Sequence, residues 1–240
     1  MRQRRIKNLF EKIEKYSDVI VSDASATKGK WNQAFGNDNP VFAEIGSGKG
    51  RFVKEMAELN PEVNFVAIEG QVKVVYHLLK TVHGHGKISD GDLEKLLNAE
   101  IPKAPDNILV MDKYIDDLRD VFKHGELRGI YLNFSDPWPK ARHEKRRLTN
   151  PKFLKQYMSV LPVGGFLEFK TDDAAFFEYS AQTMAYMSSE CGYEIAILER
   201  DLHNSEHAWG RSLTEYEAKF KRFNKPINLV RLEKTKEMLP

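Results

Sequence analysis

The sequence has little cysteine and no long apolar run, and each shortage excludes a class of protein. Cys191 is the single cysteine among 240 residues, so an intrachain disulfide is impossible and a reducing compartment is favoured. No apolar stretch approaches the roughly 20 residues that span a bilayer, and none of signal-peptide length follows the basic N-terminus. We therefore expect a cytoplasmic protein without a membrane partner.

Two common phosphate-binding patterns are also missing from the glycine-rich segment EIGSGKG at residues 44–50. A dinucleotide fingerprint that starts at Gly46 needs glycine where the chain has Arg51, and a P-loop needs Ser or Thr where the chain has Gly50. A nicotinamide oxidoreductase is therefore disfavoured. The remaining glycine turn favours a nucleoside ligand that carries no phosphates.

From residue 41 onward, apolar runs of strand type alternate with segments of helical spacing. The expected strands are residues 41–45, 64–69, 107–112, 129–134, 164–172 and 193–201. The expected helices are residues 51–60, 72–82, 151–161 and 176–190, with a further short one at 92–100 inside an uneven segment. This alternation predicts an α/β fold with a Rossmann-like, doubly wound and mostly parallel sheet. We expect a basic N-terminal arm at residues 1–30 and a single domain at residues 31–240.

Two glutamates end the first two expected strands, beside the glycine turn. Ligands of such sheets bind outside the carboxyl ends of the strands, and Gly46 and Gly48 let a ligand approach the backbone closely. Glu69 follows Glu44 at the end of the next strand, where an acid can accept hydrogen bonds from ribose hydroxyls. The combination indicates S-adenosylmethionine (SAM), with Glu44 facing its cationic aminoacyl end.

The fourth expected strand ends in the octapeptide NFSDPWPK at residues 133–140. This segment resembles the Asn/Asp-Pro-Pro-aromatic turn of amino-group methyltransferases, where a flat base is held beside the methyl donor. A rigid turn with a buried tryptophan is the alternative. The strip KARHEKRR follows at once, with five lysines and arginines against Glu144. Such a strip can contact phosphates and so position a nucleic acid.

Several motifs together resemble those of the bacterial tRNA (guanine-N7-)-methyltransferases, from about residue 29 to about residue 226. They are EIGSGKG, IEG, YLNFSDPWPKARHEKRR, FKTD, DLHNS and TEYEAKF. The long string around DPWP is the most specific, whereas many SAM enzymes share the glycine loop. The resemblance implies a class I SAM-dependent methyltransferase fold and methylation of N7 on a variable-loop guanosine of tRNA, with S-adenosylhomocysteine as the second product.

The resemblance also implies roles for individual residues. The catalytic residue would be Asp136, and the cofactor would be bound by Glu44, Gly46, Gly48, Glu69, Tyr114 and Asp136. The target nucleotide would be contacted by Lys140, Asp172, Thr214, Glu215, Tyr216 and Glu217. The remaining RNA contacts would come from Arg142, His143, Lys145, Arg146 and Arg147. Thr214 and Glu217 also have the spacing of a helix capping box, which is compatible with a site at a helix N-terminus.

One position departs from the family pattern, which usually has an acidic or amide residue facing the adenine after the third strand. Ungapped counting places Tyr114 there, and Asp112 or Asp116 could take the role through a shift. Two rival functions follow from the sequence: a SAM enzyme that acts on another base or on a protein, and a tRNA-binding module without catalysis. No obligate protein partner is indicated.

The chemistry of N7 methylation fits the residues that are present. Guanine N7 has an in-plane lone pair and no proton, so its attack on a methyl group needs no general base. Carboxylates are suitable acceptors for the N1–H and N2–H₂ donors of guanine, and we expect Asp136 and Asp172 to hold that edge. His83 and His85 are a weak candidate pair for a metal and fit an ordinary loop better, so no metal is expected.

Overall fold

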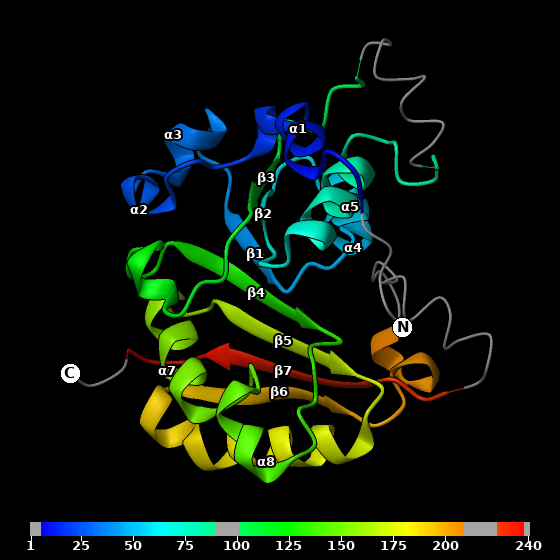
Figure 1. Ribbon diagram of the computed structural model, residues 1–240. Coiled ribbons are helices and arrows are strands. Elements are labelled where there is room, and N and C mark those ends of the chain that lie inside the picture. Colours follow the sequence, from blue (N-terminus) through cyan, green and yellow to red (C-terminus); the bar gives the residue numbers. More distant parts are fainter. Residues whose placement is uncertain (1–5, 90–100, 209–224, 238–240) are drawn as a thin grey trace.

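Seven strands form one sheet in the order β3-β2-β1-β4-β5-β7-β6 (Figure 1). The computed structural model describes residues 6–89, 101–208 and 225–237. The strands are β1 (Val41–Ile45), β2 (Asn64–Ile68), β3 (Ile108–Met111), β4 (Leu127–Asn133), β5 (Phe166–Thr171), β6 (Tyr193–Glu199) and β7 (Asn228–Lys234). The strands β1 to β5 run parallel to one another, and β7 runs antiparallel to both β5 and β6. The predicted fold class is confirmed.

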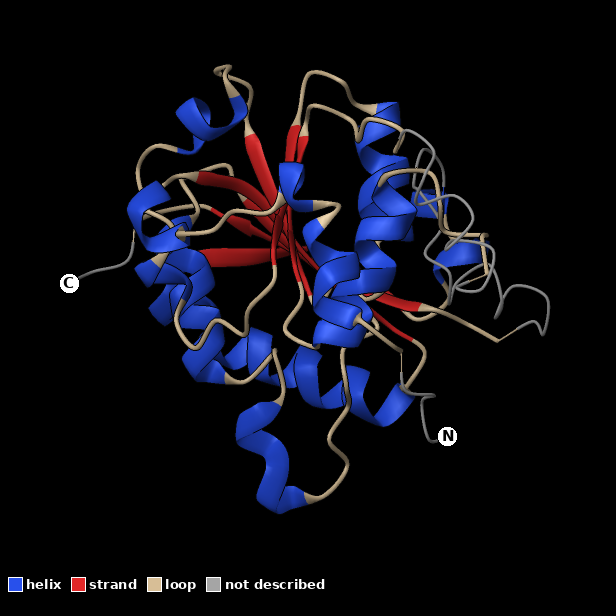
Figure 2. Cartoon of the chain, turned by 45° about the horizontal axis from the view of Figure 1, so that its top comes forward, coloured by secondary structure: helices blue, strands red, loops and turns tan. Residues whose placement is uncertain are grey.

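Helices cover both faces of the sheet (Figure 2). One face packs against α4 (Arg51–Leu59) and α5 (Val72–Val82), through buried side chains such as Phe52, Val75 and Phe65. The other face packs against α7 (Pro151–Val160) and α8 (Ala174–Cys191), through Leu154 and Met184. The shorter α1 (Leu9–Glu14), α2 (Ala24–Thr27) and α3 (Trp31–Phe35) precede the sheet. The 3₁₀ helices are η1 (Ser17–Val19), η2 (Leu118–Asp120), η3 (Ala141–Arg146), η4 (Leu202–Asn204) and η5 (Glu206–Ala208).

The strand β7 was not predicted from the sequence, although it lies inside the sheet between β5 and β6. Its letters NLVRLEK place Arg231 and Glu233 between the buried Val230, Leu232 and Lys234. The buried Lys234 donates from Nζ to the carbonyl of Leu161 at 2.8 Å. The charged side chains obscure the strand pattern, and pairing with two neighbouring strands stabilises it.

Residues 6–30 of the expected arm pack against the domain. Tyr16 is fully buried and its hydroxyl lies 3.0 Å from Nδ1 of His85. The buried His83 lies with Nε2 3.0 Å from Oδ1 of Asp18. The two histidines therefore anchor the N-terminal segment to the end of α5. The boundary at residue 30 stays a prediction, and Arg2, Arg4 and Arg5 lie outside the described residues.

Among residues 6–89, 101–208 and 225–237, no helix is long and apolar enough to cross a membrane. In the same ranges, no group of three or more His, Cys, Asp or Glu side chains is placed to hold a metal ion. The helix expected at residues 92–100 lies outside the described part of the chain.

Candidate active site

A cavity of about 750 Å³ opens at the carboxyl ends of the central strands. Its walls come from the loops that follow β1, β2, β3 and β4, and from one side of α7. This is the edge where a parallel α/β sheet binds its ligands. Every residue predicted to bind the cofactor lines this cavity: Glu44, Gly46, Gly48, Glu69, Tyr114 and Asp136.

The glycine turn after β1 is fastened to the end of β2. Gly46 and Gly48 have φ of 77° and 56°, in the left-handed region that residues with a Cβ adopt at a cost. The backbone N–H of Gly48 donates to Oε2 of Glu69 at 3.1 Å, and the N–H of Gln71 donates to Oε1 at 2.8 Å. Each carboxylate oxygen of Glu69 keeps a further lone pair, which a ribose hydroxyl could use.

Glu44 is a buried acid with one oxygen left unsatisfied. Its side chain is 3% exposed, and Oε1 accepts a 2.9 Å hydrogen bond from Nδ2 of Asn133. No described residue forms a hydrogen bond with Oε2. Burial raises the pKa of Glu44 to about 8, against the opposing effects of Asn133 and of the nearby Lys170. A buried, unsatisfied carboxylate in a cavity wall fits a ligand that carries a positive charge.

Asn133 was missed as a site residue. It ends β4 and lies beside Lys170 of β5 in the sheet register. A polar side chain that ends the buried stretch GIYLN of β4 is a signal that the sequence does contain. Because β4 and β1 are neighbouring strands of the sheet, the side chain of Asn133 can reach Glu44.

The turn after β4 carries Asp136 on a constrained backbone. Phe134 and Trp138 have φ of 52° and 41°, the left-handed region, which is strained for residues with bulky side chains. Such strain of about 1–3 kcal/mol for each residue is concentrated at functional sites. Asp136 is exposed, lines the cavity and forms no hydrogen bond with the rest of the described chain. Its carboxylate is therefore available to a ligand.

Tyr114 and Asp116 line the cavity beside the glycine that follows Glu69, whereas Asp112 does not. The ring of Tyr114 lies against Gly70 so closely that a Cβ there would come within 2.4 Å of ring atoms. Tyr114 is nevertheless 74% exposed, because its other face is open. Tyr114 and Asp116 both remain candidates for the adenine side of the site.

Two of the predicted nucleotide contacts, Lys140 and Asp172, lie outside the cavity wall. Lys140 is exposed and lies outside the lining. Asp172 forms an ion pair with Lys225 and also lies outside it. Thr214, Glu215, Tyr216 and Glu217 are outside the described residues.

The basic strip consists of Lys140, which precedes η3, the residues of η3, and Arg147, which follows it. Lys145 and Arg146 line the cavity, and the guanidinium of Arg146 stacks over the ring of Trp138 at 4.9 Å. His143 contacts the same ring edge-on, with the ring centroids 5.6 Å apart. Arg142 is exposed. The later part of the strip, Lys145 and Arg146, therefore lies at the cavity, whereas Lys140 and Arg142 lie on the surface outside its lining.

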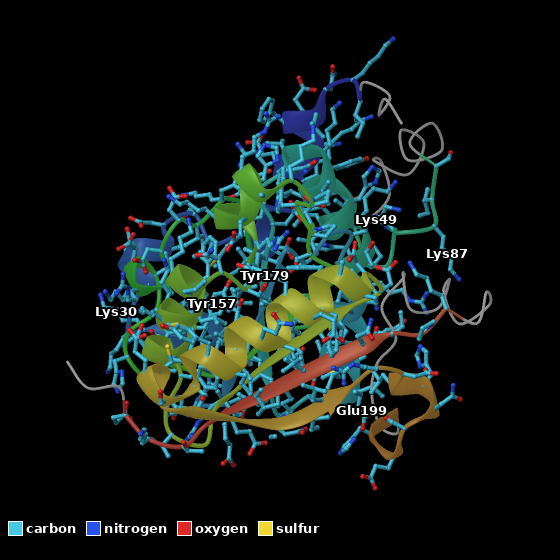
Figure 3. The ribbon with its side chains drawn as sticks, turned by 90° about the horizontal axis from the view of Figure 1, so that it is seen from below. Lys30, Lys49, Lys87, Tyr157, Tyr179 and Glu199 are labelled. Atoms are coloured by element: carbon cyan, nitrogen blue, oxygen red, sulfur yellow. The ribbon has the colours of Figure 1, made fainter. Side chains whose placement is uncertain are left out.

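A wall of α7 was not predicted as part of the site. Gln156 accepts from the N–H of Leu118 at 3.3 Å and donates to the carbonyl of Asp116 at 3.2 Å. Tyr157, labelled in Figure 3, is buried, and its hydroxyl has no partner among the described residues. Burial raises the pKa of this hydroxyl. The helical spacing of these residues is that of an ordinary core face, so the sequence gives no separate signal for them.

The chain matches known proteins over most of its length. A family model described as "Putative methyltransferase" matches residues 38–230. The tRNA (guanine-N(7)-)-methyltransferase of Bacillus subtilis (strain 168) is 42% identical over 217 residues, covering 90% of this chain and 91% of the relative. The protein of the same name from Geobacillus thermodenitrificans (strain NG80-2) is 41% identical over 210 residues, covering 88% and 87%.

Solved structures resemble the fold at low sequence identity. The 16S rRNA methyltransferase KamB has a TM-score of 0.54 and 13% identity, covering 87% of this chain and 94% of its own. A structure described as an antibiotic related methyltransferase has a TM-score of 0.54 and 16% identity, covering 85% and 92%. At such identities the likeness shows the fold alone.

Proposed function

We propose that this chain, which belongs to the tRNA (guanine-N7-)-methyltransferase family, transfers a methyl group from SAM to N7 of a guanosine in tRNA. The single observation that carries the assignment is the shared cavity. Asp136, on the constrained turn, lines the same cavity as Glu44 and Glu69. A variable-loop guanosine is the proposed target, and a tRNA substrate fits a cytoplasmic enzyme.

The residues of the cavity fit the cofactor that this activity requires. Glu44 would pair its unsatisfied oxygen with the ammonium of the aminoacyl end, and Glu69 would accept from the ribose hydroxyls. Tyr114 or Asp116 would flank the adenine. When bound, SAM supplies an electrophilic methyl group on a sulfonium centre. Because Gly46 and Gly48 have no side chains, the ligand can lie directly against their backbone.

The guanine would be held from the side of the Asp136 turn. Asp136 accepts from the donors on the Watson–Crick edge of guanine, and adenine presents a different pattern there. Alignment of N7 with the methyl group lowers the barrier, and the carboxylate stabilises the positive charge that develops on the base. Lys140 and Asp172 contact the nucleotide from outside the cavity wall.

Labelled SAM and tRNA from cells that lack this modification provide the direct test. We expect the label in 7-methylguanosine after digestion to nucleosides, because N7 needs only alignment with the donor. Label in another nucleoside or in protein would contradict the assignment. Calorimetric binding of SAM without any transfer would instead indicate a binding module.

The exposed strip gives a prediction for RNA binding. Arg142→Gln should weaken tRNA binding and lower the slope of log K against log salt by about one, because one phosphate contact is lost. Fluorescence titration at several salt concentrations measures the slope. Arg128→Gln is the matched control. Arg128 is exposed near the start of β4, whereas the Asp136 turn and the basic strip follow the other end of that strand. Equal slopes in both variants and wild type would contradict an RNA contact by Arg142.

A further inference from the structure

Arg147 differs from the other cations of the basic strip because its guanidinium is turned inward. We propose that Arg147 is a positioning residue that holds the Asp136 turn in its active shape, and not a phosphate contact. The proposal rests on the methyl-transfer function stated above. The observations that support it are the contacts of the Arg147 guanidinium, with the Asp136 turn on one side and with α8 on the other.

On one side, the guanidinium binds the turn itself. Nε donates to the carbonyl of Pro137 at 3.0 Å, and Nη2 donates to the carbonyl of Trp138 at 3.2 Å. The planar fork of arginine suits two neighbouring acceptors, whereas the ammonium of lysine is a point charge. The peptide units just after Asp136 are thus held from a residue 9 or 10 positions along the chain.

On the other side, the guanidinium packs on α8. Its carbon lies 4.1 Å from the ring centroid of Tyr179 and 5.9 Å from that of Phe176. The hydroxyl of Tyr179 donates to Oε1 of Glu144 at 2.9 Å, which ties η3 to the same helix. Figure 3 looks onto α8 and labels Tyr179. Arg147 is therefore half-buried between the turn and this helix.

The turn needs such a support because of its own composition. Pro137 and Pro139 have no backbone N–H, so they donate no hydrogen bond that could close the turn locally. Trp138, between them, holds a left-handed φ of 41°. A strained conformation persists only where surrounding contacts fix it. Arg147 supplies two of those contacts, directly beside Asp136.

The position of α8 adds a second consequence. The helix begins at Ala174, and the Asp173 side chain caps it by accepting from the N–H of Phe176 at 2.8 Å. Asp172 immediately precedes this cap. Arg147 thus connects the turn that carries Asp136 with the helix whose start follows Asp172, the two acids proposed to hold guanine.

A pair of lysine substitutions separates positioning from phosphate binding. Arg147→Lys keeps the positive charge that a phosphate contact needs, but it loses the fork that binds two carbonyls. We expect kcat at saturating tRNA and SAM to fall about a hundredfold, the scale of a misplacement near 1 Å. The tRNA Kd, its salt slope and the SAM Kd should stay near wild type. Arg128→Lys, the matched control at an exposed arginine outside the cavity lining, should leave kcat unchanged.

Two further variants test the positioning role of Arg147 independently of Arg147→Lys. Arg147→Gln should leave the salt slope of tRNA binding unchanged, in contrast to Arg142→Gln. Tyr179→Leu removes the aromatic support but keeps the guanidinium, so it should also lower kcat at an unchanged slope. This variant decides the matter if Arg147→Lys does not fold, as judged by SAM binding and thermal unfolding.

Other outcomes would overturn the proposal. Full kcat in Arg147→Lys, or in Tyr179→Leu, would show that the turn does not depend on these contacts. A salt slope lowered by Arg147→Gln as much as by Arg142→Gln would identify a phosphate contact. Absence of methyl transfer to tRNA by the wild-type chain would instead refute the proposed function.

Discussion

An Asp136→Ala variant is expected to lose methyl transfer to tRNA by about a hundredfold to a thousandfold in kcat/KM, while SAM affinity stays within a few fold. The expected loss follows from removal of the acceptor that aligns guanine and stabilises the developing cation. SAM affinity is retained because Glu44 and Glu69 are untouched. Single-turnover assays with labelled SAM, with calorimetry for SAM binding, measure the two quantities separately.

The control for this variant is Asp120→Ala, which removes an exposed carboxylate outside the cavity lining. It should leave both transfer and SAM binding unchanged. Near-normal turnover by Asp136→Ala would eliminate Asp136 as the group that holds the base. A large loss of SAM affinity would instead place the carboxylate on the cofactor.

Glu44→Gln is expected to stabilise the protein without cofactor at alkaline pH. Burial raises the pKa of Glu44 from 4.5 to about 8, so the folded state binds this proton more tightly than the unfolded state. The contribution is present in full below pH 4.5 and is lost as the pH rises to about 8. At one pKa unit per 1.36 kcal/mol, the loss is on the order of 5 kcal/mol. Thermal unfolding of both proteins between pH 5 and pH 9 checks the expectation, and parallel curves would contradict it.

The same substitution should weaken SAM binding by about tenfold to a hundredfold, the worth of a charge-assisted hydrogen bond. Wild-type affinity should rise toward pH 8 because the cation binds the ionised form of Glu44, with release of a proton that calorimetry in two buffers detects. Glu168→Gln is the matched control, since Glu168 is a buried acid of β5 paired with Arg231. That variant should lose stability and keep its SAM affinity.

The positions that the sequence predicted well are those where local chemistry and topology agree. Gly46, Gly48 and Glu69 follow apolar strands, Glu44 lies at the end of one, and parallel topology brings such strand ends to one edge. The turn at Asp136 was placed for the same reason. Each of these residues lines the cavity, although their roles in binding stay predictions.

The residues that the sequence did not reveal depend on tertiary contacts. Asn133 and Glu44 are 89 positions apart in the chain, and they meet only because β1 and β4 are neighbours in the sheet. Gln156 and Tyr157 have the spacing of an ordinary helix face. Arg147 has the same charge as its neighbours in the strip, and only its tertiary contacts, with the carbonyls of the turn and with the ring of Tyr179, distinguish it. The strand β7 is evident from its pairing with β5 and β6, and not from the pattern of its residues.

The N-terminal segment also bears on self-association. The edges of the sheet are β3 and β6, and an open edge is a template for pairing with another chain. Ile20 forms a parallel bridge to Val110 of β3, and the N–H of Val21 donates to the carbonyl of Val110 at 2.9 Å. At the other edge, the register of β6 is broken between Ile195 and Ile197. The segment anchored by the two histidines thus occupies hydrogen-bonding groups on β3 that would otherwise be open to another chain.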